Sequence, residues 1–164
     1  DEQFTPYTFS GQTTIFMDMD KEGKIWFSDT PNSKIGNFDP KTEEFEIISL
    51  PQFTLVSQKS IPTSVAIDHD NDVWIAIIDQ SILLEYDQET KNFDIYNTLT
   101  PDAGPTAIEI DSSNNVWFAE SLVGNLGKID SQTKEMMAPY RENPEWMSEW
   151  KEELLKIMKD CMTE

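Results

Sequence analysis

Three aspartates at alternate positions give this chain its nearest approach to a metal-binding pattern. Asp68, Asp70 and Asp72 have the spacing of the first ligands of a calcium-binding loop. Such a loop also needs a glycine at its sixth position and a glutamate at its twelfth, and both are absent here. Two interpretations follow: a polar turn whose carboxylates bind backbone amides, or a weak Ca²⁺ or Mg²⁺ site. No other cofactor is expected.

Proton transfer near neutral pH needs a base, and the chain contains a single histidine, His69. It lies inside the same acidic segment and is interpreted as a solvated loop residue. Asp29 and Glu120 are a second candidate set, because each follows a tryptophan by three positions. They would either face a ligand or form salt bridges between structural units. The chemistry-bearing residues therefore favour binding over catalysis.

A repeat positions these residues. The pattern of aspartate, five further residues and tryptophan occurs three times, over residues 20–26, 68–74 and 111–117. The intervals from Trp26 to Trp74 and from Trp74 to Trp117 are 48 and 43 positions. A second aspartate falls 13 residues after each tryptophan, and a threonine follows three positions later. A period of roughly 40–45 residues is typical of a four-stranded β-propeller blade.

The second copy shows how one unit is expected to fold. Residues 63–68 alternate and include β-branched side chains, which predicts an inner strand. Residues 73–78 are apolar on both faces, as in a strand packed between two blades. Residues 82–86 and 93–96 complete the sheet, and the polar segment 69–72 is the turn between the first two strands.

The predicted fold is all-β, a partial propeller of about three four-stranded blades over residues 1–140. The repeats run over about 13–50, 61–100 and 105–140, and residues 3–9 match the outer strand of a preceding blade. Propellers typically close with about four to eight blades. Three blades would leave apolar faces that need a cover. A second copy, a larger parent protein and the C-terminal segment are the three candidates.

Residues 141–164 are predicted to form an amphipathic α-helix. Asn143 and Pro144 suit its first positions. Apolar residues then recur at spacings of 3, 4, 3 and 4, a seam of about two heptads. They are Met147, Trp150, Leu154, Ile157 and Cys161. The helix would pack on its own domain, or join a second copy or another protein.

Composition limits the partners and the location of the chain. The formal net charge is −19 and the pI about 4.2, and such a field repels nucleic acid. No apolar run approaches the roughly 20 residues of a transmembrane segment. Cys161 is the single cysteine, so no internal disulfide forms. The acidity, and a chain that starts at Asp1, fit an extracytoplasmic protein whose leader was removed, or a fragment.

Residues 25–42 closely resemble a repeat of the virginiamycin B lyase (streptogramin lyase) type. They read I-W-F-S-D-T-P-N-S-K-I-G-N-F-D-P-K-T, against approximately V-W-F-T-(E/D)-x-x-x-N-K-I-G-R-(F/I)-D-P-x-T-G in that family. The third copy keeps much of this pattern over residues 116–130. The second copy has Leu83 and Leu84 in place of the Ile-Gly pair. The resemblance covers about residues 3–138.

The resemblance implies a seven-bladed propeller. It also implies, for the enzymes of the family, a metal-assisted C–O elimination of streptogramin B antibiotics by histidines and a glutamate. The family's Pro-His-Gly motif reads Pro-Thr-Ser at residues 62–64 and Pro-Thr-Ala at 105–107. Thr63 and Thr106 replace the histidine, so no catalytic base is carried over. The expected function is a non-catalytic binding or assembly module. The alternative is a lyase that is active only with further blades or subunits.

Overall fold

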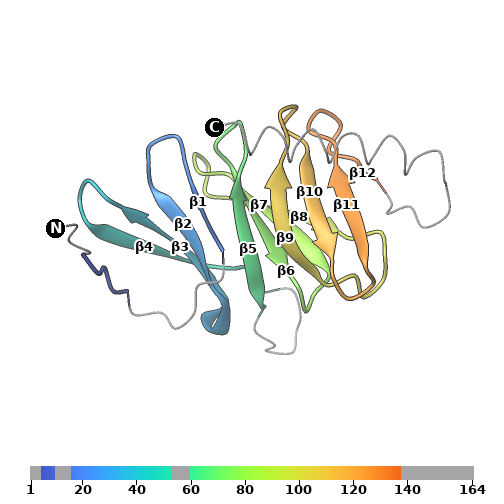
Figure 1. Ribbon diagram of the computed structural model, residues 1–164, viewed down its shortest axis with the longest axis horizontal. Coiled ribbons are helices and arrows are strands. Elements are labelled where there is room, and N and C mark those ends of the chain that lie inside the picture. Colours follow the sequence, from blue (N-terminus) through green and yellow to red (C-terminus); the bar gives the residue numbers. More distant parts are fainter. Residues whose placement is uncertain (1–4, 10–15, 53–59, 138–164) are drawn as a thin grey trace.

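The computed structural model describes residues 5–9, 16–52 and 60–137. Within these ranges the chain forms three four-stranded antiparallel sheets, each built from strands consecutive in sequence (Figure 1). The all-β prediction of four-stranded blades is confirmed. The helix predicted over residues 141–164, with its five seam residues, lies outside the described residues. In the described part of the chain, no helix is long and apolar enough to cross a membrane.

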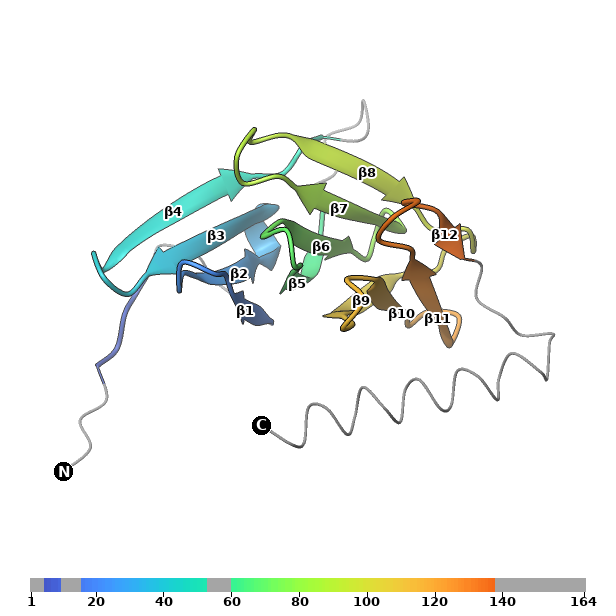
Figure 2. The same cartoon turned by 90° about the horizontal axis from the view of Figure 1, so that it is seen from above.

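Each sheet corresponds to one copy of the repeat. Blade 1 comprises β1 (Met17–Met19), β2 (Ile25–Asp29), the 3₁₀ turn η1 (Thr30–Asn32), β3 (Lys34–Asp39) and β4 (Glu44–Ser49). Blade 2 comprises β5 (Pro62–Ile67), β6 (Val73–Ile77), β7 (Ile82–Tyr86) and β8 (Phe93–Asn97). Blade 3 comprises β9 (Pro105–Ile110), β10 (Val116–Glu120), β11 (Asn125–Ile129) and β12 (Met136–Met137). Figure 2 shows the blades as a curved row, with β1, β5 and β9 on its concave side.

The core lies between the blades. The first buried cluster joins Trp26 and Ile35 of blade 1 to Val73, Ile75 and Ile77 of β6. The second cluster joins the opposite face of β6, through its tryptophan, to β10 and β11 of blade 3. Every residue of β6 is therefore buried, which explains why this strand is apolar on both faces. The tryptophan of the repeat points toward the following blade at both interfaces.

Residues 5–9 cover part of the opposite face of blade 1. The ring of Tyr7 lies 4.7 Å from that of Phe38, and the ring of Phe9 lies 4.8 Å from that of Phe27. Phe9 also contacts Phe45, with ring centroids 5.9 Å apart. The segment contains no strand in the structure. The pairing with another blade that the sequence predicts for residues 3–9 stays a prediction.

Glycines opposite phenylalanines explain why the second copy departs from the repeat. A Cβ atom on Gly127 would lie 2.1 Å from Cζ of Phe118, its partner on the neighbouring strand. Gly36 stands in the same relation to Phe27. In blade 2 the corresponding pair is Ile75 and Leu84, so a smaller side chain on β6 leaves room for a larger one on β7. The Ile-Gly pair of the repeat is thus coupled to the residue after its tryptophan.

We therefore expect Gly127→Ala to destabilise the chain by about 1–3 kcal/mol, the usual cost of overpacking a core. The double variant Phe118→Ile with Gly127→Leu, which copies the pair of blade 2, should recover most of this loss. Urea unfolding followed by tryptophan fluorescence measures both. An unchanged stability of Gly127→Ala would show that the ring of Phe118 moves aside freely.

Candidate functional site

The aspartate of each repeat binds the tryptophan that follows it. In blade 2, Oδ2 of Asp68 accepts a hydrogen bond from Nε1 of Trp74 at 3.0 Å. Oδ1 of Asp68 accepts from the backbone amides of Asp70 and Asp72, both at 2.9 Å. Blades 1 and 3 repeat the arrangement, with indole-to-carboxylate distances of 2.8 Å. One buried carboxylate therefore closes the turn and holds the indole, which accounts for the fixed spacing of five residues.

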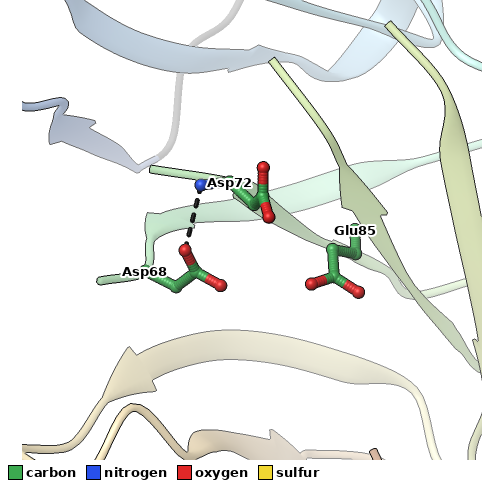
Figure 3. Close-up of side chains that lie close together, drawn as sticks. All are labelled: Asp68, Asp72 and Glu85. Carbon is green, nitrogen blue, oxygen red and sulfur yellow. Dashed lines mark hydrogen bonds between the residues drawn. The ribbon is translucent and has the colours of Figure 1, made fainter. Parts of the chain in front are cut away.

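Carboxylates of blade 2 form one acidic cluster. Oxygen atoms of Asp68, Asp72 and Glu85 all lie within 4.8 Å of one another (Figure 3). Asp70 is not part of this group, because its Oδ2 accepts from Nδ2 of Asn114 in blade 3 at 3.1 Å. The structure thus brings together two of the three predicted metal ligands. It adds Glu85, which the sequence analysis missed. The feature that could have identified Glu85 is its position directly opposite Trp74 on the neighbouring strand.

A lysine from the next blade already supplies positive charge to this cluster. Nζ of Lys134 lies 2.6 Å from Oε1 of Glu85 and 5.1 Å from the ring centre of Trp74. The hydroxyl of Tyr96 donates to Oε2 of Glu85 at 2.6 Å. A cation bound by the cluster would have to compete with Lys134 and with the indole of Trp74. The arrangement fits an ionic link between blades 2 and 3 better than an open metal centre.

Asp72 belongs to the cluster and has a raised pKa. Burial raises the pKa of Asp72 from 3.8 to about 6, and the charges of Asp68, Glu85 and Asp87 add to this effect. In blade 3 the equivalent position is Asn115, whose Nδ2 donates to Oδ2 of Asp111 at 2.9 Å. Burial alone would raise the pKa of Asp111, but the hydrogen bonds from Asn115 and Trp117 bring it below its usual value. The same turn therefore works with an amide where blade 2 has a carboxyl.

The other predicted site residues lie at the ends of two strands. Asp29, at the end of β2, accepts from Nδ2 of Asn32 at 3.0 Å through both oxygens. Glu120, at the end of β10, is fully buried, and its Oε2 accepts from Nδ2 of Asn125 at 3.3 Å. Oε1 of Glu120 has no hydrogen-bond partner among the residues that the structure describes. The two carboxylates occupy equivalent places in blades 1 and 3.

The threonines at the family's histidine positions bind backbone or hydroxyl groups. Oγ1 of Thr63 lies 3.1 Å from the carbonyl oxygen of Thr106 and 3.3 Å from that of Pro105, both in blade 3. Oγ1 of Thr106 shares a hydrogen bond with the hydroxyl of Ser121. His69 is exposed and contributes its backbone, whose amide donates to Oδ1 of Asn114 at 2.7 Å. The contacts of Thr63 and His69 join blades 2 and 3, whereas the contact of Thr106 lies within blade 3, and none of these contacts involves a side-chain base.

Comparison with known proteins places the chain by its fold. No protein-family model and no curated protein sequence matches it. A solved streptogramin B lyase has a TM-score of 0.72 at 17% identity, over 84% of this chain and 44% of that one. A catalytically inactive virginiamycin B lyase from Staphylococcus aureus with quinupristin has a TM-score of 0.70 at 18% identity, over 83% of this chain and 43% of that one. An extracellular domain from B. thetaiotaomicron has a TM-score of 0.61 at 18% identity, and the match covers 84% of this chain and 18% of that one.

The class of protein follows from these likenesses and from the three sheets. The chain has the fold of β-propeller blades, and the predicted similarity to streptogramin lyases is confirmed at the level of the fold. It spans less than half the length of the lyases that it matches.

The repeated carboxylate gives a first prediction for the site. Asp68→Ala removes the acceptor of one indole and two amides, so we expect a loss of about 2–4 kcal/mol in unfolding free energy. Asp87→Ala is the matched control, because Asp87 also binds two turn amides but holds no indole. Its loss should be clearly smaller in the same urea titration. Equal losses would mean that the turns alone, without the tryptophan contact, carry the stability.

The raised pKa gives a second prediction, for Asp72→Asn. Since the folded pKa of about 6 lies above the ordinary 3.8, the folded chain binds more protons between these values. Its stability therefore falls as the pH rises through this range. Allowing for partial exposure, the variant should be more stable than the parent by about 1 kcal/mol at neutral pH.

The stability difference between Asp72→Asn and the parent should shrink toward pH 4, where both chains are neutral at this position. Thermal unfolding at a series of pH values measures it. An advantage of the variant that is larger at pH 4 than at pH 7.5 would contradict the assignment.

Proposed function

We propose that the chain is a non-catalytic assembly module built from streptogramin-lyase-like propeller blades. It binds a second copy or another protein subunit through its blade faces, with residues 141–164 as a further contact. One observation carries the proposal: the threonine at the family's first histidine position, Thr63, serves the interface between two blades. At this position a histidine that the lyases would use for proton transfer is replaced by a residue that holds two blades together.

Polar contacts between blades support this proposal. Between blades 1 and 2, the hydroxyl of Thr30 donates to the carbonyl of Pro62 at 2.7 Å, and that of Ser33 to the carbonyl of Ser60 at 2.6 Å. Oδ2 of Asp18 accepts from the amide of Ile67 at 2.7 Å. Each interface thus combines an apolar centre with directional hydrogen bonds, as specific protein interfaces do. A face built in this way suits binding of a further blade.

An extracytoplasmic location belongs to the same proposal. The net charge of −19 suits a protein that stays soluble outside the cytoplasm. An extracellular domain is among the solved structures with a similar fold.

A lyase active only with further blades or subunits is the second candidate. The buried Oε1 of Glu120, which lacks a hydrogen-bond partner within the described ranges, favours it together with the fold likeness to the lyases. A buried carboxylate of this kind costs free energy unless a ligand or a further residue binds it. The base would have to come from outside the described part of the chain.

The proposed function predicts no elimination of virginiamycin B by the purified chain, with or without Mg²⁺. The readout is loss of the intact cyclic substrate by liquid chromatography. Metal-dependent opening of the substrate ring by this chain alone would contradict the proposal and favour the second candidate. The variant Glu120→Gln would then show whether the buried carboxylate takes part.

Light scattering on a sizing column separates the two kinds of partner. A mass of twice 18.9 kDa would identify a second copy, and a constant 18.9 kDa would leave another protein, or residues 141–164 of the chain itself, as the cover of the blade faces. Removal of residues 141–164 shows whether they contribute to the mass observed.

A further inference from the structure

Turn asparagines link blades 2 and 3 to the blade that precedes each of them. Asn71 of blade 2 accepts a hydrogen bond at Oδ1 from the backbone amide of Lys21 in blade 1, at 2.9 Å. Asn114 of blade 3 accepts in the same way from the amide of His69 in blade 2, at 2.7 Å. Both asparagines stand fourth in the Asp-x5-Trp segment, and both donors stand second. The same bond thus joins successive blades.

The asparagine amides make a second bond to the preceding blade. Nδ2 of Asn71 donates to Oε2 of Glu22 at 2.8 Å, and Nδ2 of Asn114 donates to Oδ2 of Asp70 at 3.1 Å. We call this pair of bonds the turn latch. Asn71 and Asn114 have φ angles of 75° and 64°, in the left-handed region that asparagine tolerates. The latch therefore needs a residue type that fits both the backbone and the neighbouring blade.

The turn latch runs in one direction, from the asparagine of one blade to the turn of the blade before it. The first and last blades therefore offer different halves of the latch. Blade 1 has Gly23 at the asparagine position, with φ of 85° and no side chain to offer a preceding blade. Blade 3 has Ser112 at the donor position. The amide of Ser112 donates no hydrogen bond within residues 5–9, 16–52 and 60–137. The blade 3 end therefore presents the amide donor of the latch to a following blade, with Ser113 where the carboxylates of Glu22 and Asp70 stand in the other two turns.

Charge at the same end specifies the following blade further. In blade 2, Glu85 lies opposite the repeat tryptophan and pairs with Lys134 of the next blade. In blade 3 the place of Glu85 is taken by Lys128, whose Nζ lies 4.8 Å from the ring centre of Trp117. An ion pair at the equivalent place between blade 3 and a following blade would therefore need a negative charge on the following blade. A following blade should carry an acidic residue where blade 3 has Lys134.

We propose that the blade 3 end binds a propeller blade of another protein. That blade carries asparagine at the fourth position of its Asp-x5-Trp turn and an acidic residue at the position of Lys134. The inference rests on the proposed function and names its partner. A second copy would supply Glu43 for Lys128, but it has Gly23 in place of the asparagine. The charge of −19 on each copy also opposes self-association at low ionic strength.

The variant Gly23→Asn serves as a surrogate for this partner. The left-handed φ of Gly23 suits asparagine, and a Cβ atom there meets no atom within 4 Å. The variant also keeps Glu43. In light scattering over a concentration series, at about 0.15 M salt where exposed charges are screened beyond roughly 8 Å, it should associate with a Kd at least about tenfold below that of the parent chain.

Two matched variants isolate the latch. Gly23→Ala adds a Cβ atom without an amide and should leave the parent Kd unchanged. Ser112→Pro removes the donor, and proline suits this second position of a turn closed by the amide of Asn114 on the carbonyl of Asp111. Combined with Gly23→Asn, it should abolish the gain. Thermal unfolding of each variant confirms that it is folded before its mass is interpreted.

A second measurement observes the latch directly. Unlabelled Gly23→Asn is titrated into the ¹⁵N-labelled parent chain, and the amide of Ser112 should shift and become protected from exchange. No gain in association and no change at Ser112 would overturn the inference, as would an equal gain from Gly23→Ala. Tight head-to-tail pairing of the parent chain that Ser112→Pro abolishes would also overturn it, because the partner would then be a second copy. Turnover of virginiamycin B, by contrast, would refute the proposed function whatever the latch does.

Discussion

The buried hydrogen bond between a repeat aspartate and the tryptophan six residues later is the interaction on which the structure depends. It gives the carboxylate of Asp68 a partner in the core and points the ring of Trp74 at the following blade. A buried carboxylate without such donors would cost several kcal/mol, and a buried indole without an acceptor about 1–3 kcal/mol. Each group therefore requires the other, and their spacing is the same in all three copies.

The same hydrogen bond also determines how the turns of neighbouring blades contact each other. Once the indole faces the next blade, the two turns lie close enough for the asparagine of one to bind the amide of the other. Blade 2 has neighbours on both sides and is the most buried of the three. Every residue of its strands β6 and β7 is buried. Blades 1 and 3 each have one neighbour within the described residues. The proposed association therefore concerns the free halves of the latch, at Gly23 of blade 1 and Ser112 of blade 3.

The sequence predicted much of the fold because its signals are local. Alternation and polar turns placed the strands of blade 2 to within about one residue, and the period of the tryptophans identified the blades. Contacts between copies were not predicted in this way. Glu85 joins the acidic cluster through strand pairing, and Asp70 turns to Asn114, 44 positions away. A D-x-D-x-D spacing cannot show that its middle carboxylate belongs to another interface.

Amide hydrogen exchange at three equivalent turn positions tests the central claim, that turn asparagines link the blades in one direction, most directly. The amides of Lys21 and His69 are bound by asparagines of the following blade, and that of Ser112 has no acceptor in the described part of the chain. In the isolated chain, the account predicts exchange at Lys21 and His69 about tenfold or more slower than at Ser112, after correction for sequence. Equal protection at all three positions, or fast exchange at Lys21 and His69, would contradict it.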